Sequence, residues 1–521
     1  MGSGCKTVAF RVDSSLKIGA GHVMRCLALA DGMKDMGAEA VFVCREHEGN
    51  LSKLIAERGF RVLGLAAPED HWTLDEPARP YAEWLGTDWQ TDADQTIKAL
   101  GGIYPDWLIV DHYALDARWE KRLRAVSGRI LVIDDLADRK HACDALVDPS
   151  LLPRVGGRYE DLVPDRAVQM LGPDYALLRS EYRDLREQVA PRKGFIRRVL
   201  VSFGGVDQQG LTRMAVEALM TLDGHEFEAE VVLRSTAPDY SALEQKIATR
   251  ENFRLHDGVP NLAPMMASAD LMVGACGTTS WERLCLGLPA IVVTVADNQR
   301  AIAEELAGRK LIRWLGDAKA VTASALQAAL VSVFEMGLDV HWSLRCFGVV
   351  DGRGVERVCA VLGAHPDMPL VIRQAEQRDE ALLLEWVNDA QTRQSAFNAR
   401  PISYIEHKEW FQGRLSNPRQ CRIYIAETTL GVPVGQVRFD EHPDGWHIDY
   451  ALAPQFRGFR LGTNLLAAAI ERLRNETSAQ TLVADVLSEN VGSIRVLEKL
   501  NFSRKNEADA KSIRFVMEPA E

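Results

Sequence analysis

The chain has 521 residues, of which 47% are hydrophobic and 26% charged, so it has an ordinary globular composition but is too long for one core. We expect about three domains. The net charge of −12 argues against nonspecific binding to nucleic acid or to an anionic membrane, but permits a local basic pocket for a phosphorylated ligand. Without a bilayer-spanning apolar run, a signal peptide or any C-x-x-C pair among nine cysteines, the sequence predicts a cytoplasmic protein with reduced thiols.

Strands and helices alternate through the first two thirds of the chain. Runs that are typical of strands occupy residues 7–12, 40–44, 107–111 and 130–134, and again 198–203, 230–233, 271–274 and 290–294. Repeated βαβ units predict parallel sheets. We therefore predict an α/β pair of doubly wound Rossmann-like domains, at 1–190 and 191–364, with a helix before 362 that returns to brace the first. Such a pair binds its ligand in the cleft at the carboxyl ends of the strands.

The pattern changes after a linker at 364–369, which contains two prolines. A strand at 370 is followed by a helical segment, 376–415. Strands that read as antiparallel then occupy 421–427, 433–440 and 447–452, before one helix and two more strands. The sequence predicts an α+β domain over 368–521.

The first strand leads into Gly19-Ala-Gly-His-Val-Met-Arg25, which has the composition of a phosphate cradle. Glycines at 19 and 21 allow close backbone approach to a phosphate, and His22 opens the following helix. Histidine titrates near neutral pH, so His22 is a candidate base. It is equally a candidate for a structural or phosphate-contacting role. Asp13 is either a stabiliser of positive charge on a sugar ring or a structural residue.

Matching parts follow in the second predicted domain. Gly204 and Gly205 end a strand before a helix and can offer N–H groups to a pyrophosphate. Hydroxyls and a carboxylate gather at another helix start, where they bind nucleotide or serve as caps: Thr278, Thr279, Ser280 and Glu282. A glutamate there can hold two ribose hydroxyls. The carboxamides of Asn298 and Gln299 suit sugar hydroxyls or acetamido groups, or belong to a helix cap.

The motif order G-x-G-H-x-x-R, S-F-G-G, G-x-x-G-T-T-S-W-E and D-N-Q over residues 6–362 resembles GT-B nucleotide-sugar enzymes related to the lipid II glycosyltransferase. More narrowly, it resembles the UDP-2,4-diacetamido-2,4,6-trideoxy-β-L-altropyranose hydrolases of pseudaminic acid biosynthesis. The resemblance implies that water attacks the anomeric carbon with inversion and expels UDP without a metal, and that His22 is the base. Water and a sugar hydroxyl need the same base, so motif chemistry does not separate a hydrolase from a transferase.

A second phosphate-binding pattern, Arg457-Gly-Phe-Arg-Leu-Gly462, follows the strand at 448–452. It resembles the acetyl-CoA pyrophosphate loop of the GCN5-related N-acetyltransferases, and 486–502 resembles the closing motif of that superfamily. Residues 385–398 resemble acetyltransferases that act on the 4-amino group of amino-sugar nucleotides. The resemblance implies acetyl-CoA as co-substrate, bound by Leu452, Arg457, Gly458, Arg460, Leu461, Gly462, Thr463, Asn490 and Ser493.

Two positions depart from the superfamily. Arg460 stands where glycine is usual, and Leu497 stands where a tyrosine often supplies the general acid. His447, Asp449 and Tyr450 lie near the coenzyme strand and are candidates for acid–base roles, or are ordinary polar residues of a strand.

The combined hypothesis is a bifunctional enzyme. The C-terminal domain would acetylate UDP-4-amino-4,6-dideoxy-β-L-AltNAc, and the N-terminal pair would hydrolyse the product to UDP and 2,4-diacetamido-2,4,6-trideoxy-L-altrose. Neither a metal nor a nucleic-acid or membrane partner is expected, and the sequence does not indicate the oligomeric state. Two alternatives remain: a GT-B glycosyltransferase fused to an amino-sugar acetyltransferase, and a hydrolase with an inactive domain that senses acetyl-CoA.

Overall fold

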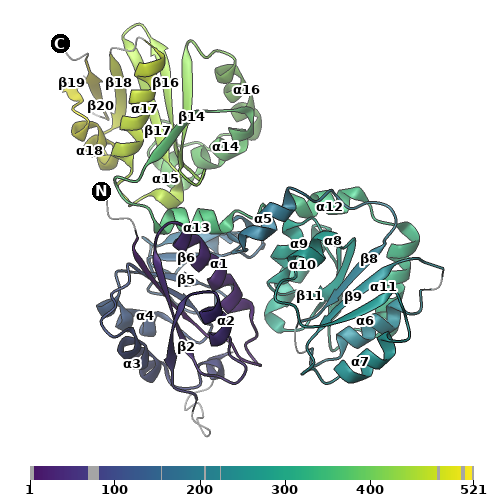
Figure 1. Cartoon of the computed structure of the whole chain (residues 1–521). Helices are drawn as coiled ribbons and strands as arrows, with labels where there is room; N and C mark the ends of the chain where they lie inside the picture. The colour runs from purple at the N-terminus through teal and green to yellow at the C-terminus, as the bar shows by residue number, and fades with distance from the viewer. Residues whose placement is uncertain are drawn as a thin grey trace. The chain divides into compact units, whose positions relative to one another are not determined.

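The computed structural model of this chain describes residues 5–68, 81–153, 155–204, 207–222, 224–477, 481–505 and 511–518. The chain divides into two compact units, Lys6–Val358 and, for the most part, Cys359–Glu521. The first unit holds two parallel sheets and the second holds one mixed sheet (Figure 1). Domain boundaries at 190/191 and 364/368 stay a prediction.

The first sheet has the strand order β3-β2-β1-β4-β5-β6-β7, all parallel. Its strands are β1 (Thr7–Val12), β2 (Glu39–Arg45), β3 (Arg61–Leu65), β4 (Trp107–Asp111), β5 (Arg129–Ile133), β6 (Ala145–Asp148) and β7 (Val168–Leu171). Its helices are α1 (Gly21–Asp35), α2 (Ser52–Glu57), η1 (Ala82–Leu85), α3 (Trp89–Leu100) and α4 (Ala117–Leu123). Helix α5 (Ser180–Arg186) follows in the chain and packs against helices of the second sheet. Both faces of the first sheet are buried. Trp119 packs into the core under α3 and α4, and the stacked Phe10 and Phe42 rings fill the other face.

The second sheet has the order β10-β9-β8-β11-β12-β13 and is also parallel. Its strands are β8 (Arg198–Ser202), β9 (Glu228–Leu233), β10 (Phe253–Asp257), β11 (Leu271–Ala275), β12 (Ala290–Thr294) and β13 (Arg313–Asp317). Its helices are α6 (Leu211–Leu219), α7 (Tyr240–Ile247), α8 (Ala263–Ser268), α9 (Thr279–Cys285), η5 (Asp297–Gln299), α10 (Arg300–Gly308), α11 (Ala323–Met336) and α12 (Val340–Phe347). Each sheet begins in its middle and winds outward in both directions. The predicted pair of doubly wound folds is confirmed.

Helix α13 (Gly354–Leu362) follows α12. Its first residue lies against the segment before α5, so closely that a Cβ on Gly354 would stand 2.2 Å from the Ala176 carbonyl oxygen. Only glycine fits at this approach.

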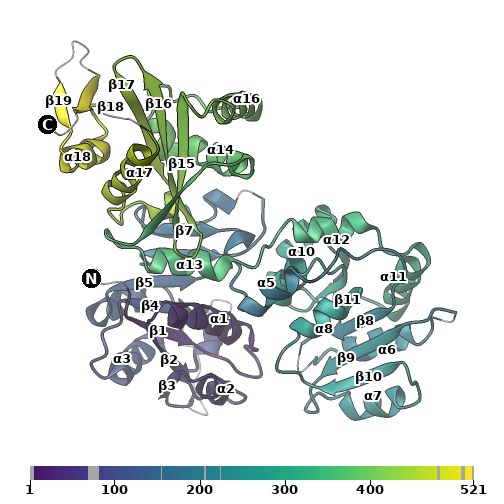
Figure 2. The same ribbon diagram turned by 45° about the horizontal axis from the view of Figure 1, so that its top comes forward.

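The third sheet has the order β14-β15-β16-β17-β18-β20-β19. Its strands are β14 (Leu370–Gln374), β15 (Cys421–Thr428), β16 (Pro433–His442), β17 (Gly445–Leu452), β18 (Leu482–Leu487), β19 (Ser503–Lys505) and β20 (Ser512–Met517). Its helices are α14 (Glu380–Asn388), α15 (Ala390–Gln394), α16 (Tyr404–Leu415), α17 (Gly462–Glu476) and α18 (Val491–Lys499). Figure 2 shows α17 on one side of the central strands, with α14 and α16 on the other. The predicted α+β fold is confirmed.

The one parallel pair of this sheet, β17 with β18, is short. Within the described residues it joins only Trp446 to Leu482 and His447 to Val483, whereas β17 continues to Leu452. Backbone groups beyond His447 on that edge of β17 are thus left for another partner. The strand then runs through the 457–462 loop into the start of α17.

Candidate active sites

The central feature of the first unit is a buried imidazole backed by a carboxylate. His22 lies in the first turn of α1, and Asp111 ends β4, the strand that pairs with β1. The His22 Nδ1 stands 2.7 Å from Asp111 Oδ1. An ionised carboxylate only accepts hydrogen bonds, so Nδ1 carries the proton and Nε2 keeps the lone pair. That tautomer is the one a general base requires.

Arg25 stabilises the carboxylate. Its Nε and Nη2 donate to the two oxygens of Asp111 at 2.7 and 2.6 Å, a bidentate pair. Burial works to raise the pKa of Asp111, but Arg25 and then His22 outweigh it and hold that pKa well below its ordinary value. Asp111 is therefore ionised at every pH at which the enzyme would work.

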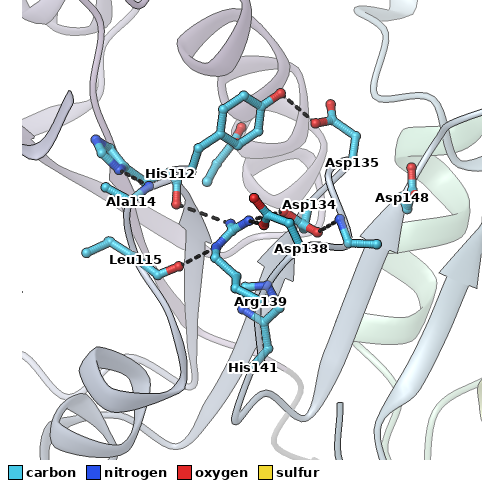
Figure 3. Close-up of polar contacts among 12 residues, drawn as sticks. His112, Ala114, Leu115, Asp134, Asp135, Asp138, Arg139, His141 and Asp148 are labelled. Atoms are coloured by element: carbon cyan, nitrogen blue, oxygen red, sulfur yellow. Dashed lines mark hydrogen bonds and ion pairs between the residues drawn. The ribbon is translucent and has the colours of Figure 1, made fainter. Parts of the chain in front are cut away.

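The loop after β5 completes this support. Asp135 accepts from Arg25 Nη1 at 2.9 Å and from the Tyr113 hydroxyl at 2.5 Å. The neighbouring Asp134 accepts from Arg139 Nη1 at 2.7 Å, which fixes the loop that carries Asp135 (Figure 3). Arg25 is thus oriented from two directions.

Aromatic rings lie around His22. The Tyr113 ring meets it edge-on with centroids 4.7 Å apart, and Trp84 lies 6.0 Å away in the same manner. Trp84 and Tyr113 stack on each other, and Tyr81 contacts both. This apolar surround lowers the local dielectric, which strengthens the His22–Asp111 interaction.

Asp13 lies in a separate buried network. Its side chain is fully buried; one oxygen accepts from Arg11 Nη1 at 2.6 Å and from the Arg45 backbone N–H at 2.7 Å. The other oxygen faces His112 Nε2 at 3.3 Å and His47 Nε2 at 3.6 Å. Burial opposes ionisation, but Arg11 holds the pKa of Asp13 well below its usual range. In this arrangement Asp13 has no exposed surface with which to touch a sugar.

Three residues of the predicted nucleotide set line one small cavity of about 40 Å³: Gly21, Thr278 and Glu282. A Cβ on Gly21 would stand 3.3 Å from the Thr278 hydroxyl oxygen, so glycine permits this approach. Burial raises the pKa of Glu282. Gly19 has φ +81° in the turn before α1, as a glycine-rich cradle requires.

The other predicted nucleotide contacts have mixed surroundings. Thr278 stands at the N-cap of α9 without a side-chain cap hydrogen bond, and Thr279 is the first residue of that helix. Ser280 is fully buried and accepts from Arg283 Nη2 at 2.9 Å, so its hydroxyl is used internally. Asn298 lies in η5, and Gln299 accepts from the Val295 backbone N–H at 3.0 Å.

The predicted glycine pair at the end of β8 is only partly described. Gly204 has φ +103°, a conformation that favours glycine. Gly205 lies outside the described residues.

The second unit contains a cavity of about 810 Å³. All nine residues predicted to bind acetyl-CoA line it: Leu452, Arg457, Gly458, Arg460, Leu461, Gly462, Thr463, Asn490 and Ser493. The lining residues include six cationic side chains and a single carboxylate, that of Asp449. Because the first N–H groups of a helix are unpaired, the start of α17 adds to this anion-binding character.

Two arginines of the coenzyme loop differ in their partners. Arg460 has φ +62°, a left-handed backbone conformation that favours glycine, and its exposed side chain lines the cavity. Arg457 instead reaches α15, with Nη1 2.6 Å from Asp389 Oδ1 and Nη2 donating to the Thr392 hydroxyl at 2.9 Å. Its guanidinium is therefore largely occupied by protein groups.

Two of the three acid–base candidates on β17 line the cavity and the third does not. Tyr450 and Asp449 line the cavity. His447 does not; its Nε2 lies 2.9 Å from Asp444 Oδ1 at the other end of the strand. Burial raises the pKa of Tyr450 to about 12, with Ser493 as a hydrogen-bonding neighbour. Asn490 caps α18 by accepting from the Ser493 N–H at 3.1 Å, which leaves its amide NH₂ for a ligand.

No role was predicted from the sequence for Asp111, Tyr113 or Arg25, although Arg25 closes the G-x-G-H-x-x-R motif and Asp111 ends a predicted strand. A carboxylate at the end of the strand beside β1 was the available signal. His407 was missed as well; it lines the cavity of the second unit from α16 and carries no local motif.

Comparisons with known proteins agree with this division. Residues 198–340 match the glycosyltransferase family 28 C-terminal domain, and residues 369–503 match the acetyltransferase (GNAT) domain. Uncharacterized protein MJ1062 of Methanocaldococcus jannaschii is 22% identical over 512 residues, which span 95% of this chain and 96% of that protein.

A second relative matches the first unit. UDP-2,4-diacetamido-2,4,6-trideoxy-beta-L-altropyranose hydrolase of Campylobacter jejuni is 26% identical over 302 residues, or 58% of this chain and 96% of the relative. The solved structure of MurG from Acinetobacter baumannii covers 68% of this chain and 99% of its own, at 14% identity and a TM-score of 0.47.

The fold, the two sites, the two matching family models and the hydrolase relative define an enzyme of two parts. Its first unit is of GT-B type and is related to a sugar-nucleotide hydrolase. Its C-terminal part is a GNAT N-acetyltransferase domain. No helix of the described residues is both long and apolar enough to cross a membrane.

Proposed function

We propose that the chain is a bifunctional nucleotide-sugar enzyme of pseudaminic acid biosynthesis. It transfers the acetyl group of acetyl-CoA to the 4-amino group of UDP-4-amino-4,6-dideoxy-β-L-AltNAc. It then hydrolyses the product to UDP and 2,4-diacetamido-2,4,6-trideoxy-L-altrose, with inversion and without a metal, in the cytoplasm. The observation that carries this proposal is the His22–Asp111 pair in a chain that also has the acetyl-CoA cavity.

In the hydrolytic step His22 Nε2 takes a proton from water while the water oxygen bonds to the anomeric carbon. The bond from that carbon to the diphosphate oxygen breaks, and UDP leaves with the electron pair. Asp111 stabilises the imidazolium that forms, since its charge lies 2.7 Å from Nδ1. In this proposal Asp13 does not touch the sugar. It has a structural role and holds the ends of the strands beside β1 in place through its buried hydrogen bonds.

The nucleotide is held at helix starts. Backbone N–H groups near Gly19, Gly204 and Thr279 stabilise the diphosphate as its charge grows, and the predicted contact of Gly205 belongs to the same group. Glu282 accepts from the ribose hydroxyls. Asn298 and the free NH₂ of Gln299 contact the sugar.

For acetyl transfer the diphosphate of the coenzyme lies on the N–H groups of the 458–462 loop, with Arg460 adding positive charge. The open edge of β17 binds the pantetheine arm. The neutral amine attacks the thioester carbonyl carbon and the C–S bond breaks with its electron pair on sulfur. The thiolate receives a proton from the Tyr450 hydroxyl, which regains one from the nitrogen as the amide forms. That hydroxyl stays protonated until it is needed because burial raises its pKa to about 12.

Product analysis tests the proposal. Pure protein is incubated with the 4-amino nucleotide sugar and acetyl-CoA, with and without chelator, and the products are identified by mass and NMR. We expect free diacetamido sugar, UDP and CoA in both reactions. Hydrolysis only after an acceptor sugar is supplied would make the first unit a glycosyltransferase. Coenzyme binding without acetylated product would leave the chain a hydrolase alone.

A further inference from the structure

The acetyl-CoA cavity contains a buried histidine whose role neither the motif analysis nor the comparisons assign. His407 is 2% exposed and lines the cavity from the first turns of α16. A capping box formed by Ser403 and Glu406 fixes the start of that helix, so the position of the ring is well defined.

The tautomer of His407 follows from its one hydrogen bond. The ring Nε2 lies 3.0 Å from the backbone carbonyl oxygen of Glu380 at the start of α14. A carbonyl only accepts, so Nε2 carries the hydrogen and Nδ1 keeps the lone pair. No partner for Nδ1 occurs in the described part of the chain, and the ring borders the cavity. The lone pair is therefore available to a bound molecule.

The walls near His407 suit a cationic amine on an anionic nucleotide sugar. The rings of His407 and Trp410 lie 5.5 Å apart, and the Arg438 guanidinium lies 5.3 Å from the Trp410 ring centre. Across the cavity, Asp449 is 3.7 Å from Arg438 Nη2 and accepts from Gln436 Nε2 at 3.0 Å. A half-exposed carboxylate attracts an ammonium, and arginine attracts phosphate.

Resting on the proposed function, we infer that His407 is the general base of acetyl transfer and that its Nδ1 receives a proton from the acceptor ammonium. The deprotonated nitrogen forms its bond to the thioester carbonyl carbon, and the C–S bond breaks. The thiolate leaves with the electron pair and takes a proton from the Tyr450 hydroxyl, which regains one from the nitrogen as the amide forms. The imidazolium returns its proton to water. The products are the amide and CoA thiol.

The charged surroundings fit this role. Burial lowers the pKa of His407, while Glu380 from α14 works in the opposite direction. The charged groups that line the cavity are Asp449 from β17, Arg438 from β16 and Arg393 from α15, together with Arg457 and Arg460 of the loop before α17 and Arg495 and Lys499 of α18. The imidazole is therefore neutral at neutral pH and able to accept a proton.

The test compares His407→Gln with Lys408→Gln in the full chain. Glutamine keeps a donor for the Glu380 carbonyl but does not titrate; Lys408 is the exposed neighbour on the same helix. Acetyl transfer to the 4-amino nucleotide sugar is followed by CoA release from pH 6 to 9.5. Affinity for acetyl-CoA and hydrolysis of pre-acetylated substrate are measured alongside.

We expect His407→Gln to slow acetyl transfer about a hundredfold at pH 7. The deficit shrinks towards pH 9.5, where the amine loses its proton without help, and Lys408→Gln stays at the wild-type rate. Coenzyme affinity and hydrolysis are unchanged. A wild-type rate for His407→Gln, or a deficit that is equal at every pH, overturns the inference.

If His407→Gln fails to bind acetyl-CoA, His407→Ala with added imidazole decides. Regained transfer supports the inference, and no gain at saturating imidazole overturns it. A wild-type chain that acetylates no amine at any pH would instead overturn the proposed function on which the inference rests.

Discussion

The two sites of this chain each present a histidine with one nitrogen bonded to an oxygen and the other without a hydrogen-bond partner among the described residues, but the oxygens differ. His22 is backed by the ionised Asp111, which is itself held by Arg25, whereas His407 is backed by a neutral backbone carbonyl. A carboxylate stabilises a neighbouring imidazolium by its full negative charge, whereas a neutral carbonyl does so only by its dipole. Water is a poor nucleophile and has to be deprotonated as it attacks, whereas an ammonium becomes a good nucleophile once it has lost one proton.

The charges around the two sites differ in the same sense. Near His22 the arginine is paired with two aspartates. In the acetyl-CoA cavity, no ion pair joins Arg460, Arg495 or Lys499 to another described residue. Paired charges fix geometry before the substrate arrives, whereas free cations attract a polyanionic coenzyme.

The largest expected effect comes from removing the carboxylate-backed base. His22→Gln and Asp111→Asn should each slow hydrolysis about a hundredfold or more, while acetyl transfer by the same chain is unchanged. His256→Gln is the matched control, since that histidine lies on the edge strand β10 of the second sheet, where it pairs with Glu230 of β9. UDP binding by His22→Gln separates lost chemistry from lost structure. Equal losses in His22→Gln and His256→Gln would contradict the contrast.

Next in size is the stability of the buried network around Asp13. Asp13→Ala leaves Arg11 short of one partner and should lower the free energy of unfolding of the first unit by about 3 kcal/mol. Asp94→Ala, in an exposed ion pair with Arg122, should cost less than about 0.5 kcal/mol. Chemical denaturation monitored by fluorescence measures both, and equal costs would deny the network its structural role.

The pH dependence of that stability has a definite sign. Because Arg11 and Arg25 hold the folded-state pKa values of Asp13 and Asp111 below those of the unfolded chain, their contribution is complete above about pH 4 and is lost as pH falls further. The denaturant concentration at the unfolding midpoint should decrease as the pH drops below about 4 in the wild type, and should decrease less steeply in Asp13→Ala.

The strands and site residues that could be predicted are those with a strong local pattern in the sequence. The buried strands β1, β4 and β12 have apolar runs and were predicted to the residue. The peripheral β3 and β13 have the same length as β4 and β12 but are only half-buried, so their apolar pattern is weak and they were missed. The lining residues between 457 and 463 lie close together in the sequence, so a local motif could identify them. His407 lines the same cavity only because the tertiary fold brings α16 there, and a local sequence pattern does not record that.

A smaller effect is expected for nucleotide binding. Glu282→Gln should weaken UDP about tenfold, as loss of charge-assisted hydrogen bonds to ribose implies, without changing acetyl transfer. Isothermal titration with UDP, and with uracil as a ligand that lacks ribose, checks this. If UDP affinity stays the same, Glu282 is only a favourable charge in the first turn of α9.

The smallest effect concerns Arg460. Arg460→Gly relieves a left-handed residue and should stabilise the second unit by up to about 1 kcal/mol, while weakening acetyl-CoA severalfold and flattening its salt dependence. Asn501→Gly, at φ +63°, is the matched control and should leave coenzyme affinity unchanged. Tighter coenzyme binding by Arg460→Gly would mean that the arginine obstructs the phosphates.

The central claim is that His22 directs water at the sugar and not at phosphorus. Hydrolysis of the diacetamido nucleotide sugar in ¹⁸O-labelled water, read by mass spectrometry of both products at early times, tests it most directly. We predict one labelled oxygen in the released sugar and none in UDP. Label in UDP would mean attack at phosphorus and would contradict the role given to His22.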